Sequence, residues 1–294
     1  MNANTQSQPV RIGIIGGSGL YRMEGLSNVE ERSFSTPFGE PSDNVLIGTI
    51  DDVPVAFLAR HGRGHVLMPS EVNYRANIYA LKSLGVEQVI SVSACGSLRE
   101  HLHPGEVVIP YQLFDFTKKR DYTFFGEGLV AHIGIADPFC YRLSALLGDA
   151  LEGAGGTVHR GGRFITIEGP RFSTKGESFT YRAWGMDIIG MTTSPEAFLA
   201  REAEMCYAVM GHVTDYDVWH ETEEQVNVEM LLATLHANTE LAQDAVRTLV
   251  PRLASAGRAC ECDSALASAF ITQRDLIPEE TRERLVPIVS KYVG

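Results

Sequence analysis

Short apolar runs that end in clusters of Gly, Ser, Thr, Arg, His or Asp recur along this chain. Helix-like segments lie between most of them, and this alternation predicts an α/β fold around a mixed or largely parallel sheet. Open α/β sheets bind ligands at the carboxyl ends of their strands, so we expect the polar clusters to face one crevice. The apolar runs that end in this way cover residues 11–15, 53–59, 88–93, 163–168 and 206–214.

No repeat, low-complexity tract or Pro/Ser-rich linker divides the sequence. We therefore predict a flexible, polar N-terminus at residues 1–10 and a single domain over 11–294. The expected helices cover residues 69–84, 139–153, 174–185, a segment from Pro195, 227–256, and two shorter ones within about 264–290.

The charge balance narrows the classes of partner. With 25 Lys+Arg against 37 Asp+Glu, the formal net charge is −12, which argues against a nucleic-acid or anionic-membrane binder. No apolar run reaches the roughly 20 residues that span a bilayer. Five cysteines without a signal peptide indicate a cytoplasmic protein with reduced thiols.

Two clusters are suited to binding an anion. The glycines around Ser18 allow backbone N–H groups to curl around an anion, although they equally fit a tight turn. A dinucleotide fingerprint is absent, because Arg22 stands where its third glycine would be. Two arginines and two histidines between Arg60 and His65 follow the run 53–59 directly. Arginine binds phosphate bidentately, so this loop favours an anionic ligand over a solvated surface.

The remaining clusters suit a neutral heterocycle. Asp215 and Asp217 end the last apolar run, and alternation in an extended segment would place both carboxyl groups on one side. Two close carboxyl groups raise one another's pKa, so one can be protonated near neutral pH. Phe172 could stack on a planar base or pack in the core, and the Thr192 region could bind a ligand or cap a helix. A crevice of this kind suits a base-bearing ligand that a bound phosphate attacks.

A reactive cysteine or a metal site would be an alternative basis for the chemistry of this chain. Cys95 follows an apolar run, but nothing in its local sequence lowers its pKa, which favours an inert buried thiol. Cys260 and Cys262 could bind a metal or oxidise, yet two ligands do not make a closed site. Cys140 and Cys206 could form a disulfide. We therefore predict no metal site.

Five segments, in order, resemble the 5′-methylthioadenosine phosphorylases of the trimeric purine nucleoside phosphorylase family. The resemblance, from about Ile12 to Leu249, implies a mixed, distorted central sheet flanked by helices and a homotrimer or dimer of trimers. It implies a pentosyltransferase of purine and methionine salvage, without a cofactor, which uses inorganic phosphate to split methylthioadenosine into adenine and 5-methylthioribose 1-phosphate. The segments are IGIIGGSGLY, LARHGRGHVLMPSEVNYRANIYALKSLGV, ISVSACGSLRE, IEGPRFSTKGESFTYRAWGMDIIGMTTSPEA and VTDYDVWHE.

The family's site residues carry over onto matching positions of this chain. Asp215, Asp217 and His61 match catalytic positions, and the Asp pair matches the pattern for 6-aminopurines. His132 matches a residue that a neighbouring subunit contributes, and Ser173 and Val228 match positions linked to specificity. Phosphate-binding positions match Ser18, Arg60, His61, Ser93, Ala94 and Thr192; substrate-binding positions match His132, Phe172, Ser173, Met191, Asp215, Tyr216, Asp217 and Val228. Leu232 lies four residues after Val228 on the expected helix, where it could line an apolar wall for the methylthio group or pack in the core.

Three departures from the family pattern keep other activities open. Ser18 and Ser93 replace the usual Thr, and Gly190 replaces the usual Asn. The nearest alternative is a purine nucleoside or methylthioinosine phosphorylase that prefers 6-oxopurines. A hydrolase that uses water is a second alternative, which a requirement for phosphate would exclude. A non-catalytic nucleoside-binding protein is the third, which product formation would exclude.

Overall fold

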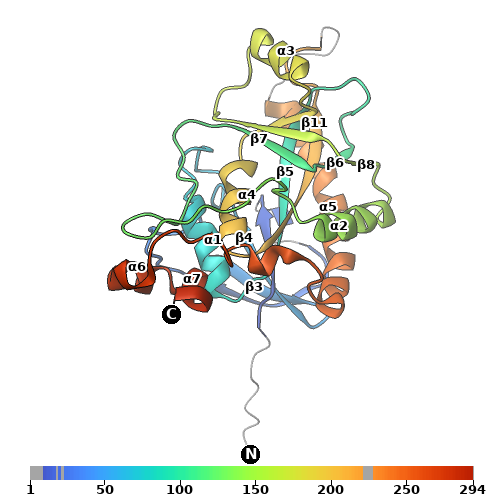
Figure 1. The fold of residues 1–294 in the computed structure, drawn as a ribbon. Helices are drawn as coiled ribbons and strands as arrows, with labels where there is room; N and C mark the ends of the chain where they lie inside the picture. The colour runs from blue at the N-terminus through green and yellow to red at the C-terminus, as the bar shows by residue number, and fades with distance from the viewer. Residues whose placement is uncertain (1–8, 18, 21–22, 221–227, 294) are drawn as a thin grey trace, which may run out of the picture.

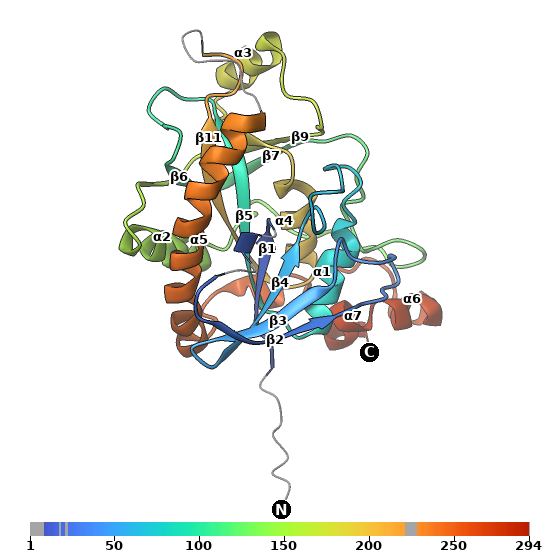
Figure 2. The same cartoon turned by 180° about the vertical axis from the view of Figure 1, so that it is seen from behind.

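The computed structural model describes residues 9–17, 19–20, 23–220 and 228–293, with the backbone alone at 228–237. Most of the predicted flexible N-terminus, as well as Ser18, therefore lies outside the described residues. All the described strands join one mixed sheet with helices on both faces (Figures 1 and 2), as predicted. The strands are β1 (Ile12–Gly16), β2 (Leu26–Arg32), β3 (Val45–Ile50), β4 (Val53–Ala59), β5 (Gln88–Ser97), β6 (Val107–Ile109), β7 (Gln112–Phe116), β8 (Val158–Arg160), β9 (Arg163–Ile167), β10 (Ile188–Gly190) and β11 (Cys206–Asp215).

The strand order creates a gap beside the long central strand β5. Strand β1 pairs with β5 in parallel and its last partner on β5 is Ser91. Strand β10 approaches from the other end and pairs antiparallel with Gly96 and Ser97. The carboxyl ends of β1 and β10 therefore meet beside residues 92–95 of β5, where neither strand continues. This opening in the sheet positions the site described below.

Side-chain alternation along the strands produces two separate apolar layers. On one face, Ile15 and Val209 join one core cluster with helices α1 and α4. On the other face, Ile14 and Met210 join a second cluster with helices α2 and α5. A strand that is buried on both faces reads as a continuous apolar run, which explains why the sequence pattern found β1, β5 and β11. The helices are α1 (Tyr74–Ser83), α2 (Tyr141–Gly153), α3 (Lys175–Ala183), α4 (Thr193–Glu202), α5 (Val228–Ala256), α6 (Glu279–Arg284) and α7 (Val286–Val293).

Local sequence signals set several helix ends. Thr174 caps α3, because its hydroxyl accepts the Glu177 N–H while the Glu177 carboxylate accepts the Thr174 N–H. Helix α1 begins at Tyr74, later than the Pro69 that we expected, because Asn73 is the residue whose side chain caps it. Near the C-terminus, two 3₁₀ turns (261–264 and 274–276) precede α6 and α7, where the sequence predicted only two helices.

Candidate active site

A cavity of about 370 Å³ opens where β1, β4, β5, β10 and β11 end or leave the sheet. Sites for small ligands commonly span about 300–1,000 Å³. Most of the predicted site residues that the structure describes line this one cavity, which joins segments from Gly17 to Thr239. The predicted residues that line it are Arg60, His61, Ser93, Ala94, Phe172, Ser173, Met191, Thr192, Asp215 and Asp217.

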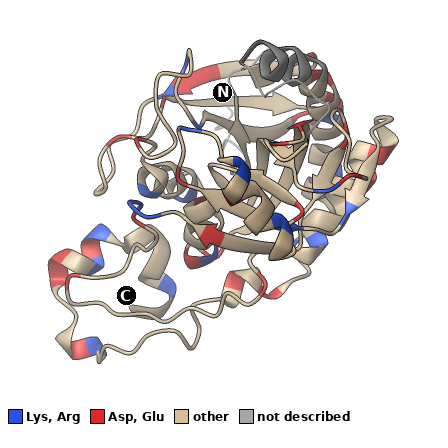
Figure 3. Ribbon diagram, turned by 90° about the horizontal axis from the view of Figure 1, so that it is seen from above, with Lys and Arg blue, Asp and Glu red and all other residues tan. Residues whose placement is uncertain are grey.

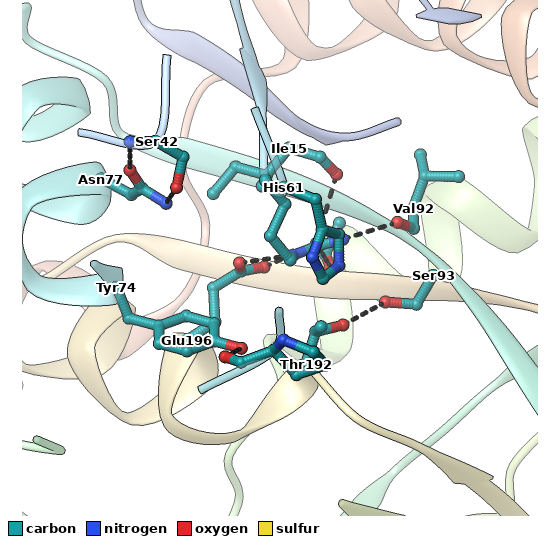
Figure 4. Close-up of polar contacts among 12 residues, drawn as sticks. Ile15, Ser42, His61, Tyr74, Asn77, Val92, Ser93, Thr192 and Glu196 are labelled. Carbon is teal, nitrogen blue, oxygen red and sulfur yellow. Dashed lines mark hydrogen bonds and ion pairs between the residues drawn. The ribbon is translucent and has the colours of Figure 1, made fainter. Parts of the chain in front are cut away.

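Two hydroxyl groups mark one end of the cavity. Ser93 on β5 and Thr192 before α4 point toward one another, with their oxygens 3.3 Å apart (Figure 4). The sequence left open whether Thr192 caps a helix. Its side chain makes no capping hydrogen bond, although it occupies the N-cap position of α4. The Thr192 hydroxyl is therefore directed at the cavity and at Ser93 (Figure 4).

His61 lies beside these hydroxyls as a neutral ring (Figure 4). Burial, reinforced by the nearby charge of Arg60, lowers the pKa of His61 to about 4. Its Nδ1 lies 2.9 Å from the carbonyl oxygen of Leu67, which can only accept a hydrogen bond. The proton of the neutral ring therefore sits on Nδ1, so Nε2 is an acceptor until it binds a second proton.

Arg60 forms the floor of this end and is held by a buried ion pair. Its Nε and Nη2 donate to the two carboxylate oxygens of Glu196 at 2.8 and 2.9 Å, and both side chains are almost wholly buried. Burial lowers the pKa of Arg60, but the Glu196 carboxylate outweighs that effect and raises it. Further bonds to the Ser91 hydroxyl and the Val92 carbonyl leave one Nη1 hydrogen without an acceptor among the described residues.

Two carboxyl groups lie at the other end of the cavity. Asp215 accepts hydrogen bonds from the Thr214 hydroxyl and the Asp217 N–H, both at 2.7 Å. Burial raises the pKa of Asp215. Burial also raises the pKa of Asp217, and the charge of Asp215 adds to this, while the hydroxyls of Ser178 and Ser173 oppose it. Both carboxyl groups are therefore easier to protonate than ordinary aspartates.

The reason we gave for the position of the two carboxyl groups was wrong. We expected an extended segment that directs both side chains to one side. Strand β11 instead ends at Asp215, and Asp217 has a φ of 50°, in the left-handed region. The turn, rather than strand alternation, brings Asp217 back to the cavity, and the hydrogen bond from its N–H to Asp215 holds it.

Phe172 and Met191 supply the apolar wall. Phe172 is 40% exposed, so it is not a core residue and its ring is available to a ligand. The Met191 sulfur lies against Gly169, where an added Cβ would come within 2.6 Å of it. Gly169 therefore allows the thioether to lie beside the loop that carries Phe172.

The glycine that departs from the family pattern has a steric explanation. A Cβ at Gly190 would lie 2.7 Å from the ring of Phe164. Phe164 is fully buried and its ring fills the space that a side chain at position 190 would need. In this chain the Phe164 ring therefore occupies the space that the usual Asn side chain would need, and the amide of that Asn is missing.

Five predicted site residues fall elsewhere or outside the described side chains, and Ser18 is one of them. Tyr216 packs against Trp219, with ring centroids 5.8 Å apart, rather than on the cavity. The His132 N–H donates to the Ala269 carbonyl at 2.8 Å, and this residue does not line the described cavity. For Val228 and Leu232 the description covers the backbone of α5 alone.

Sequence reasoning missed several residues of the site. Glu196 was read only as the start of a helix, and its partner Arg60 lies 136 positions away. His212 and Asn238 also line the cavity. Neither ring nitrogen of His212 has a hydrogen-bond partner among the described residues, and burial lowers its pKa to about 4. The one sequence feature that could have indicated His212 is that it is a histidine within an apolar run.

The surroundings of Cys95 agree with the expectation that it is an inert, buried thiol. Cys95 lines the cavity, but its thiol donates to the His212 carbonyl at 3.3 Å. Burial raises its pKa well above the usual range, which agrees with an inert thiol.

Acidic and basic residues are interspersed along the ribbon (Figure 3). None of the described helices is both long and apolar enough to cross a bilayer.

The cavity therefore has hydroxyls, a histidine and a buried arginine at one end, an apolar wall, and two carboxyl groups at the other end. The family model of the phosphorylase superfamily matches residues 11–251. The chain therefore belongs to the phosphorylase superfamily.

Individual relatives extend the comparison over nearly the whole chain. The S-methyl-5′-thioadenosine phosphorylase of Koribacter versatilis is 53% identical over 96% of this chain and 97% of its own length. The enzyme of the same name from Geobacter sulfurreducens is 54% identical over 96% of this chain and 99% of its own length. A crystal structure of methylthioadenosine phosphorylase from an antarctic soil metagenomic library aligns with a TM-score of 0.92 at 46% identity, covering 96% of this chain and all of that one. Methylthioadenosine phosphorylase from Schistosoma mansoni, solved with adenine, aligns with a TM-score of 0.82 at 37% identity, covering 90% of this chain and all of that one.

Proposed function

We propose that this protein catalyses phosphorolysis of S-methyl-5′-thioadenosine to adenine and 5-methylthioribose 1-phosphate. The observation that carries this proposal is one cavity with hydroxyls, a histidine and a paired arginine at one end and two buried carboxyl groups at the other. The names of the close relatives support the same activity. In this reaction the phosphate oxygen bonds to C1′ as the bond between C1′ and N9 breaks, and the purine leaves.

The hydroxyl end binds and orients the attacking phosphate. Ser93 and Thr192 donate to its oxygens, and the Arg60 charge attracts it. Nε2 of neutral His61 accepts a hydrogen bond from monoprotonated phosphate, or takes up a proton as the dianion arrives. An anion held below the ribose stabilises the positive charge that develops at C1′ in the transition state.

The acid end makes the purine a better leaving group. Burial favours the protonated form of Asp215, which donates to N7 of the base as electrons move onto the ring. Asp217, held beside Asp215, accepts from the N6 amino group. A 6-oxopurine offers an oxygen at that position and meets carboxylate lone pairs, which disfavours inosine and guanosine.

The apolar wall holds the sugar and the 5′ substituent. Met191 lies beneath the ribose and Phe172 lies against the base and the methylthio group, with Ser173 beside Asp217. For the methylthio group we propose Val228, from the family resemblance, and Leu232, from its spacing of four residues along the predicted helix.

Three substrates with and without phosphate test the proposal. We expect base release from methylthioadenosine to require phosphate and to be faster than release from adenosine, with inosine slowest. Release without phosphate would indicate a hydrolase, and fast turnover of inosine would overturn the assignment of the base end. Binding of methylthioadenosine without any product would favour a non-catalytic nucleoside-binding protein.

Removing the two hydroxyls should weaken phosphate binding selectively. We expect Ser93→Ala combined with Thr192→Val to raise the KM for phosphate by about 10²–10⁴-fold, since each of the two hydrogen bonds to a charged group contributes about 1.5–3 kcal/mol. The KM for methylthioadenosine should change much less. Ser97→Ala is the control, because this hydroxyl on the same strand bonds to the Arg99 backbone instead. Equal changes in both KM values would contradict the assignment.

A neighbouring subunit is the proposed source of His132 at the sugar end. Beside it, Val130 and Ile271 are 46% and 65% exposed, and the Ile271 N–H donates to the Val130 carbonyl. Exposed apolar side chains that lie together are typical of a subunit interface. We therefore propose a homotrimer, or a dimer of trimers, in which this edge reaches the next cavity.

Mixed oligomers test whether His132 acts across subunits. We expect His132→Ala and Asp215→Asn to be weakly active alone but to regain activity when unfolded and refolded together. Mixing places an intact His132 beside a cavity with an intact Asp215. Mixtures without any gain in activity, in oligomers of confirmed mixed composition, would place His132 in the cavity of its own chain or outside any cavity.

A further inference from the structure

The structure brings together four cysteines that lie far apart in the sequence. Cys140 is the N-cap residue of α2 and Cys206 begins β11. Cys260 and Cys262 come from the segment that follows α5, and the residue between them is Glu261. The four sulfur atoms all lie within 4.8 Å of one another, and those of Cys206 and Cys260 are 3.3 Å apart.

We propose that these four thiols form a structural Zn²⁺ site. Zinc in structural sites is tetrahedral, with Zn–S distances of about 2.3 Å, so its sulfur ligands lie about 3.8 Å apart. To reach that geometry from separations of at most 4.8 Å, the longest would contract by up to about 1 Å, and the Cys206 and Cys260 sulfurs at 3.3 Å would move apart by about 0.5 Å. Disulfides need the sulfurs to approach only in pairs, whereas here each sulfur lies within 4.8 Å of all three others. Tetrathiolate sites favour soft, tetrahedral metals.

The surroundings are suited to a closed metal site. Cys140, Cys206 and Cys262 are buried in the apolar layer between the sheet, α2 and α5, with Cys260 partly buried at its edge. Zinc binding displaces four thiol protons, so the loaded cluster carries two positive and four negative charges. The N-terminus of α2 at Cys140 stabilises such an anion. The guanidinium of Arg258 beside Cys206 supplies a full positive charge.

The position of the cluster implies a structural rather than a catalytic role. Cys206 and Asp215 are the first and last residues of β11. Nine steps of about 3.3 Å along a strand separate them by about 30 Å. The ligands come from a helix, a strand and the segment after α5, so the metal fastens residues 257–264 to the sheet. We predicted no metal site because Cys260 and Cys262 alone offer two ligands, whereas the fold supplies the other two.

Metal analysis of the untagged protein is the first test. We expect about one zinc ion per chain in the wild type. Cys95→Ser is the matched control. This fifth cysteine lines the candidate active-site cavity and is not part of the cluster, so the variant should retain the metal. Cys260→Ser combined with Cys262→Ser should lose it. Protein purified with zinc in the medium but containing none would overturn the proposal.

Two measurements on the wild type do not depend on how the variant folds. Titration with an organomercurial should release zinc, detected by a chromogenic chelator, in step with the modified thiols. Alkylation of denatured protein with a chelator and no reductant should modify all five cysteines. A protein in which two or four cysteines stay unmodified until a reductant is added would overturn the proposal and show an oxidised cluster. Cobalt exchanged into the site should give the intense visible bands of tetrahedral Co²⁺–thiolate coordination.

Discussion

Asp215→Asn is expected to lower kcat/KM for methylthioadenosine by about 10²–10⁴-fold, the usual contribution of a general acid. The amide cannot transfer a proton to N7. Because Asp217, rather than Asp215, is assigned to position 6 of the base, turnover of inosine should fall together with that of methylthioadenosine. Because burial raises the pKa of Asp215, the wild type should lose activity as pH rises through that raised value. The variant should lack this alkaline limb.

Asp217→Asn is the matched control for this prediction. It makes the same chemical change two residues further along the chain. We assign this second carboxyl group to the N6 amino group rather than to proton transfer. We expect weaker binding of methylthioadenosine with a smaller loss of kcat, and an alkaline limb that persists. The new amide can donate a hydrogen bond to a 6-oxo group, so the ratio of inosine to methylthioadenosine turnover should rise in Asp217→Asn. A ratio that stays unchanged in this variant would overturn the assignment of the base end.

Glu196→Gln is expected to destabilise the protein by about 3–5 kcal/mol, because it leaves the buried charge of Arg60 without its partner. Bound phosphate would supply the missing negative charge if Arg60 faces the anion site. We therefore expect phosphate to raise the urea midpoint of the variant more than that of the wild type. Equal stabilisation of both proteins by phosphate would place Arg60 outside the anion site.

Two further variants complete this experiment. Glu31→Gln breaks the exposed ion pair between Arg63 and Glu31, and it should cost less than about 1 kcal/mol with no dependence on phosphate. Arg60→Ala leaves the negative charge of Glu196 in the floor of the site. The KM for phosphate should therefore rise strongly in Arg60→Ala, a loss that Glu196→Gln should not share.

The parts of the fold that were predicted correctly are those with strong local signals. Strands β1, β5 and β11 are buried on both faces, and α3 carries a complete capping box. Strand β2 was missed because most of its residues are exposed and polar. Strands β6 and β8 have three residues each, too few for a period to show.

The candidate site was predictable where a polar residue ends or directly follows an apolar run in the sequence, as Ser93 and Asp215 do. Partnerships between distant segments were not predictable in this way. The pair of Arg60 with Glu196 depends on where α4 packs, and the meeting of Cys140 with Cys262 depends on the path of the chain after α5. Contacts of this kind follow from topology, which periodicity does not encode.

Strand β5 carries both ends of the cavity, with Ser93 at one and Gly96 beside Asp215 at the other. Three peptide steps, about 10 Å, separate these residues, and backbone geometry sets that interval. In the site that we propose, this fixed spacing sets the distance between the bound phosphate and the base. With those roles, replacements at Asp215 or Phe172 during divergence would change the base or the 5′ group, while the spacing along β5 keeps the phosphate in line with C1′. New specificities can thus evolve on this scaffold without rebuilding the chemistry.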